Sequence, residues 1–183
     1  MYCGNNRTAL ESQRQISLAL IELMSSSPFD KISVSSVCAC AGVSRQTFYS
    51  LFSSKENVVL FILRHDCCCT DVFPKGGGDG YLTQISRVFS RYIIEHRGLI
   101  RLLSVNNKTD LLHGFLRDAL SENSFIISSV QPSQRAYAAD FIAAGITSIA
   151  DTFVRQGCNL SPVSLEQLIR SMLGGSIFSS SRQ

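Results

Sequence analysis

The stretch F-D-K-I-S-V-S-S-V-C-A-C-A-G-V-S-R-Q-T-F-Y-S-L-F-S-S-K-E, residues 29–56, decides the fold of this chain. Ser33 can cap a short helix over about residues 34–41, because a serine hydroxyl accepts a hydrogen bond from the free amides of a helix start. Gly42 then supplies a tight turn, and Ser44 can cap the next helix. Two short helices joined in this way form a helix-turn-helix, whose second helix enters the major groove of DNA.

The apolar residues of this stretch recur at helical spacing, so that they lie on one face of each short helix. They can pack against a preceding amphipathic helix whose apolar face carries Ile16, Leu20 and Met24. The predicted three-helix core consists of Ile32, Val37, Ala41, Val43, Phe48 and Phe52. This packing leaves a polar face on the second short helix, made of Arg45, Gln46, Thr47 and Tyr49. A helical hairpin inside an unrelated helical protein, with these side chains merely solvated, would show the same pattern.

At these residues the sequence resembles the TetR family of bacterial transcriptional regulators. The matching elements are I-S-V-S-S-V at 32–37, A-G-V-S at 41–44, T-F-Y at 47–49 and S-K-E at 54–56. The rest of the chain is similar more loosely, in its length, its helix order and the segment E-H-R-G-L-I-R-L-L at 95–103. The C-terminal half has some likeness to the dihydroxyacetone kinase regulator branch of the family.

The resemblance implies a DNA contact surface with two kinds of residue. Contacts to phosphates, which position a protein on the duplex, are implied for Ser33, Ser44, Tyr49 and Lys55. Contacts to base edges are implied for Arg45, Gln46 and Thr47, where arginine suits guanine and glutamine suits adenine. The sequence departs from the family at Leu51, where members often carry a polar or aromatic residue near the DNA backbone, and this puts one phosphate contact in question.

The whole chain is predicted to be all-α, with two domains. Residues 1–53 are predicted to form the helix-turn-helix domain, and the resemblance implies that residues 54–183 form a helical domain for ligand binding and dimerisation. Helical patterns follow a Pro- and Gly-rich break at 74–80, and no stretch predicts a strand. They cover about 81–96, 98–103, 110–123, 133–156 and 164–178.

The last two of these helices carry broad apolar faces. By resemblance to the family they pair with their copies in a second subunit as a four-helix interface. The residues predicted there are Tyr137, Phe141, Ala144, Gly145, Ile149, Phe153, Leu165, Leu168, Ile169 and Met172. The alternative is that both faces belong to the core of a single chain.

Composition and charge permit DNA binding without requiring it. The chain has 183 residues, of which 45% are hydrophobic and 17% charged, as in a globular protein. The formal net charge is +3, too small to prove a nucleic-acid partner. No apolar run reaches the ~18 residues of a membrane span, and the start lacks the apolar stretch of a signal peptide. We therefore expect a cytoplasmic protein.

Cysteines and histidines give weak signals. Cys67, Cys68 and Cys69 are adjacent on a predicted helix and point in three directions, so they cannot all bind one metal. Packing is the favoured role for them, with a redox sensor as the alternative. His65, His96 and His113 are favoured as ordinary helix residues over ligands, and no metal site or cofactor is predicted.

The resemblance implies a regulator of transcription. No phosphate loop, nucleophile elbow or dinucleotide fingerprint occurs, so an enzyme is not predicted. We expect a homodimer, acting as a repressor, that binds a palindromic operator in double-stranded DNA. A small-molecule effector of unknown identity would release it by binding residues of the C-terminal domain that the sequence does not identify. The alternative is a coactivator, or a partner- or ligand-binding module, that has the TetR fold but does not bind an operator directly.

Overall fold

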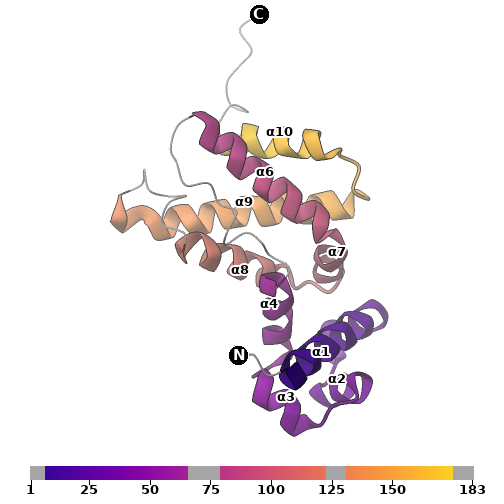
Figure 1. Cartoon of the computed structure of the whole chain (residues 1–183). Coiled ribbons are helices and arrows are strands. Elements are labelled where there is room, and N and C mark those ends of the chain that lie inside the picture. Colours follow the sequence, from indigo (N-terminus) through magenta and orange to yellow (C-terminus); the bar gives the residue numbers. More distant parts are fainter. Residues whose placement is uncertain (1–6, 66–78, 123–130, 175–183) are drawn as a thin grey trace, which may run out of the picture.

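The computed structural model describes residues 7–65, 79–122 and 131–174, and all regular structure among them is helical (Figure 1). The prediction of an all-α fold is confirmed. The N-terminal part contains α1 (Arg7–Ser26), the 3-10 turn η1 (Phe29–Lys31), α2 (Val34–Ala41), α3 (Arg45–Leu51) and α4 (Lys55–His65). The C-terminal part contains α6 (Asp79–Glu95), α7 (Arg97–Val105), α8 (Thr109–Glu122), η2 (Pro132–Gln134), α9 (Arg135–Arg155) and α10 (Pro162–Leu173).

The helices α1, α2 and α3 pack together as one unit, which we call the N-terminal unit. Its core contains Phe48 and Phe52, whose rings lie 6.0 Å apart between their centroids. Of the six residues predicted for this core, Ile32, Val37, Phe48 and Phe52 are buried, and Ala41 and Val43 are partly buried against them. The predicted bounds of α2 agree with the structure because both of its ends are set by local signals.

The helix α4 packs on both parts of the molecule. It contacts α1 on one side and α8 on the other (Figure 1). Apolar residues point to both sides of α4, since Val58, Val59, Ile62 and Leu63 are all buried. The predicted domain boundary between residues 53 and 54 therefore falls at the start of a helix that the two parts share, and the division itself stays a prediction.

The helices α6 to α10 form a second layer of packed helices, which we call the C-terminal unit. The helix α9 packs along α8 and α7, and α10 packs against α6 (Figure 1). Small side chains allow the close approach of α9, because Ala139, Ala143 and Ala150 are fully buried on one of its faces. Of the described helices, none is long and apolar enough to span a membrane.

Candidate DNA-binding surface

Local hydrogen bonds fix the start of α2, as the sequence predicts. The Ser33 hydroxyl accepts a hydrogen bond from the Ser36 amide at 3.0 Å. The Ser36 hydroxyl accepts one from the Ser33 amide at the same distance, so that the two side chains form a reciprocal cap. The part played by Ser36 was not predicted, although the spacing S-x-x-S at 33–36 is visible in the sequence.

The turn after α2 depends on the backbone of Gly42. Its φ is +66°, in the left-handed region that side chains disfavour. Immediately after this turn, the Ser44 hydroxyl accepts a hydrogen bond from the Thr47 amide at 3.0 Å and caps α3. Both predicted caps and the predicted glycine turn are therefore present.

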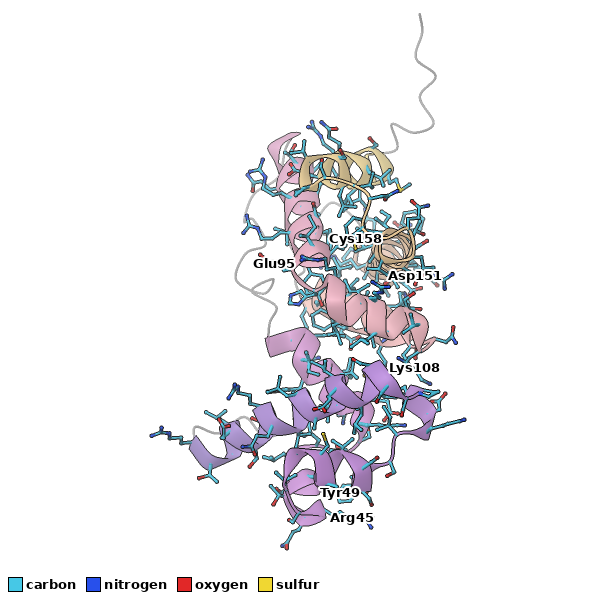
Figure 2. All side chains as sticks on the ribbon, turned by 90° about the vertical axis from the view of Figure 1, so that its right-hand side faces the viewer. Arg45, Tyr49, Glu95, Lys108, Asp151 and Cys158 are labelled. Carbon is cyan, nitrogen blue, oxygen red and sulfur yellow. The ribbon has the colours of Figure 1, made fainter. Side chains whose placement is uncertain are left out.

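One face of α3 is open to solvent and lies far from the C-terminal unit. Arg45 and Gln46 are exposed, and Tyr49 is 51% exposed. Figure 2 shows Arg45 and Tyr49 at the lower end of the molecule, well below Asp151 and Cys158 of the C-terminal unit. The Tyr49 ring is held edge-to-face by Phe48, with 5.5 Å between the centroids. Because Phe48 is fully buried, this contact anchors the exposed ring on the core.

Thr47 is less open than its neighbours. Its side chain is partly buried, and its Oγ1 lies 2.9 Å from the Ser44 hydroxyl. The Thr47 hydroxyl thus takes part in the helix cap. A contact between Thr47 and the DNA groove stays a prediction.

Leu51 does not lie on this surface. Its side chain is 5% exposed and belongs to the core. The side chain faces the interior of the N-terminal unit, so this position offers no side chain to a phosphate, and the missing contact stays a prediction.

Lys55 is the first residue of α4, and its side chain binds the segment between α1 and α2. Its ammonium group donates hydrogen bonds to the carbonyls of Phe29 and Ile32, the latter at 3.0 Å. It also lies over the Phe29 ring, 4.4 Å from the centroid. An ammonium group has three hydrogens to donate, so one remains for the phosphate contact that the resemblance implies. That contact stays a prediction.

The charge of this region suits a polyanion. Residues 31–55 contain three basic residues, Lys31, Arg45 and Lys55, and no Asp or Glu. The free amides at the start of α3 add a partial positive charge at the same end of the molecule. The surface can therefore attract phosphates through both side chains and backbone.

The cysteines next to this surface are ordinary thiols. Burial raises the pKa of Cys38. Burial and the carboxylate of Glu22, whose Oε2 lies 3.7 Å from Sγ, raise the pKa of Cys40. Both thiols are therefore protonated near neutral pH. The predicted cysteine cluster Cys67, Cys68 and Cys69 lies outside the described residues.

The predicted dimer residues divide into two groups. Tyr137 and Phe141 are 78% and 74% exposed. Between α9 and α10 lies an open groove of about 270 Å³. At least partly exposed residues of the predicted set line this groove, namely Gly145, Ile149, Leu168 and Met172. Ala144 is exposed on α9.

Three predicted dimer residues are core residues of the single chain. Phe153 is 4% exposed, and Leu165 and Ile169 are fully buried. Phe153 and Leu165 nonetheless line the groove between α9 and α10, and the interface role of all three residues stays a prediction.

Neither histidine whose environment is described has the surroundings of a metal ligand. The His96 ring packs on Tyr92, with 4.4 Å between the centroids, and the His113 Nε2 lies 3.4 Å from a carboxylate oxygen of Asp140. Within residues 7–65, 79–122 and 131–174 no three His, Cys, Asp or Glu side chains gather closely enough to hold a metal ion. The His65 side chain lies outside the described part.

Comparison with known proteins agrees with this geometry. The family model described as bacterial regulatory proteins, tetR family, matches residues 17–61. A curated relative, the HTH-type dhaKLM operon transcriptional activator DhaS of Lactococcus lactis subsp. lactis (strain IL1403), is 34% identical over 62 residues. The match covers 34% of this chain and spans only a third, 33%, of that relative.

Two solved structures share the fold over most of the chain. A protein described as the dihydroxyacetone kinase operon activator DhaS has 22% identity and a TM-score of 0.52, with 91% of this chain and 94% of that chain covered. A tetR-family transcriptional regulator from Streptomyces coelicolor has 17% identity and a TM-score of 0.59, with 91% and 80% covered. The predicted resemblance is confirmed, in sequence for the N-terminal unit and as a fold for the rest. As predicted, the proteins it resembles are transcriptional regulators and not enzymes.

Proposed function

We propose that this chain, which carries the helix-turn-helix unit of the TetR family, binds a palindromic operator as a homodimer and thereby regulates transcription in the cytoplasm. One observation carries the proposal above all others. The capped helix α3 presents Arg45, Gln46 and Tyr49 to solvent on a region without acidic residues, while Phe48 on its other side is buried. We call α3 the recognition helix from here on.

Two kinds of contact with DNA are proposed, one that reads the base sequence and one that binds the phosphates. Arg45 and Gln46 would read base edges, because their side chains are exposed at the first turn of the recognition helix. Ser33, Ser44, Tyr49 and Lys55 would bind phosphates and fix the position of the helix on the duplex.

A second copy of the chain is proposed as the partner at α9 and α10. The exposed aromatic residues Tyr137 and Phe141 and the groove beside Met172 leave apolar surface that a single chain does not cover. In a two-fold dimer the same surface meets itself, and two recognition helices about 34–36 Å apart would match one turn of DNA.

We propose that a small molecule bound within the C-terminal unit changes this spacing. Such an effector can shift the protein only by its difference in affinity between the DNA-binding and the released arrangement. We expect the outcome at the promoter to be repression. The name of the curated relative DhaS describes that protein as an activator, which makes the sign of regulation a separate measurement.

The first experiment is selection of binding sites from randomised DNA with purified protein at near-physiological salt. We expect a palindrome with half-sites about one turn apart. Arg45→Ala should alter the selected sequence. Arg91→Ala, which removes the same charge from an exposed site on α6, should leave it unchanged. A folded, dimeric protein that selects no sequence would overturn the proposal in favour of a partner- or ligand-binding module.

A further inference from the structure

The two units meet at a second place besides α4. The corner between α7 and α8, residues 106–108, contacts the corner between α1 and α2, where η1 lies. Figure 2 shows Lys108 at the level where the N-terminal helices meet the helices of the C-terminal unit. These contacts join residues that are more than 70 positions apart in the sequence.

The Asn106 side chain satisfies two backbone groups that the N-terminal unit leaves open. Pro28 has no N–H, so the Met24 carbonyl loses its usual helical partner four residues later. The Asn106 Nδ2 donates to this carbonyl at 3.4 Å and to the Leu102 carbonyl at 2.8 Å. The Asn106 Oδ1 accepts a hydrogen bond from the Phe29 amide at 2.6 Å. One amide side chain thus bridges the end of α1, the start of η1 and α7.

The backbone of the corner holds Asn106 in this position. The Lys108 amide donates to the Leu103 carbonyl at 2.8 Å, and the Asn107 amide donates to the Ser104 carbonyl at 3.1 Å. This pair of bonds closes a helix end around a left-handed residue, and Asn107 has a φ of +53°. Asparagine tolerates this conformation better than most residues. The turn is therefore fixed by its own hydrogen bonds.

Lys108 adds a charged contact to the same corner. Its ammonium lies 2.8 Å from the Asp30 carboxylate and 5.5 Å from the centroid of the Phe29 ring. Phe29 is only 1% exposed. The Phe29 ring contacts the ammonium groups of Lys55, from the start of α4, and of Lys108. The Phe29 amide donates to Asn106 of the C-terminal unit.

We propose that Asn106 and Lys108 are positioning residues, which tie the corner between α1 and α2 to the C-terminal unit and so fix the angle of the recognition helix. A unit attached through α4 alone could swing about that helix, and a second attachment removes this freedom. A shift of α7 or α8 would then move the whole N-terminal unit. The regulatory consequence rests on the proposed function, but the tie itself is a property of the free protein.

The first test uses the free protein and no DNA. In ¹⁵N relaxation measurements on the wild type, amides of α3 and α9 should report the same overall tumbling. In Asn106→Ala, α3 should tumble partly on its own, and hydrogen exchange at the Phe29 amide should rise about tenfold through the loss of its acceptor. Asn107→Gly is the matched control, because glycine keeps the left-handed turn, and it should behave as wild type.

Unchanged relaxation and exchange in Asn106→Ala would overturn the tie. Should that variant fail to fold, the pair Asp30→Lys and Lys108→Asp decides instead, since the Asp30 side chain is 77% exposed and tolerates change. In each single variant α3 should tumble partly independently of α9, and in the double variant both helices should again report the same tumbling. A double variant in which α3 tumbles as independently as in the single variants would refute the role of the ion pair.

The second test asks whether the tie serves DNA binding. Operators with half-sites moved apart by one or two base pairs should bind wild-type protein more weakly than the selected spacing. Asn106→Ala should reduce this preference about tenfold, while Asn107→Gly keeps it. An unchanged preference in Asn106→Ala would overturn the positioning role. If wild-type protein binds no operator, the proposed function fails, and the relaxation measurement still decides the tie.

Discussion

Replacing Gly42 with alanine tests whether the turn before the recognition helix depends on backbone conformation alone. A Cβ built at Gly42 meets no atom within 4 Å, so alanine brings no steric clash. The φ of +66° is the remaining obstacle, because an L side chain disfavours the left-handed region. Gly114 gives the matched control, since a Cβ there also meets nothing within 4 Å but the residue lies inside α8.

The two substitutions should change stability in opposite directions. At Gly42 the left-handed backbone costs about 1–2 kcal/mol, and the reduced freedom of the unfolded chain offsets about 0.4–1 kcal/mol. The net expectation is a loss of about 1 kcal/mol. At Gly114 alanine should stabilise the helix by about 1 kcal/mol, so the two variants should differ by about 2 kcal/mol.

Urea and thermal unfolding followed by circular dichroism of the helices would measure this difference. Protein concentration should be equal in all samples, because dimer formation adds to stability. For a chain of this size about 1 kcal/mol corresponds to roughly 2–4 °C in Tm. Gly42→Asn should fall between wild type and Gly42→Ala, since asparagine tolerates the left-handed region. A Gly42→Ala protein as stable as Gly114→Ala would refute the reasoning.

Three further predictions concern the DNA surface and the junction of the two units. Arg45→Ala should weaken operator binding by about 1–3 kcal/mol and relax the preference at one base pair, as measured against an operator library; unchanged selectivity would contradict its role in base reading. Tyr49→Phe should weaken binding to all sequences by a similar factor, and a loss confined to one base pair would argue against a phosphate contact. The Lys108 ammonium hydrogen-bonded to Asp30 lowers the pKa of that carboxyl below its ordinary 3.8. The pair therefore contributes stability above about pH 3.8, and loses it as the pH falls through the lowered pKa. The difference in unfolding midpoint between wild type and Asp30→Asn should accordingly shrink below pH 3.8, and a difference that persists in acid would show that the carboxylate charge is not its cause.

Local features of this protein were readable from its sequence. The caps by Ser33 and Ser44 and the turn at Gly42 need only residues three or four positions away, so their signals lie within a few letters. The burial of Phe48 also follows from helical spacing. The prediction of exposed polar residues on α3 rests on the same periodicity and agrees with the exposure of Arg45 and Gln46.

Long-range contacts were decided only by the tertiary structure. The helix α9 is apolar over much of its circumference, so periodicity could not separate exposed Phe141 from buried Phe153. The burial of Leu51 depends on how α3 lies on its neighbours. The missing N–H of Pro28 shows from sequence alone that the Met24 carbonyl needs another donor. That the donor is Asn106 follows only from the packing of α7 against α1, because partners so far apart in the chain leave no local pattern.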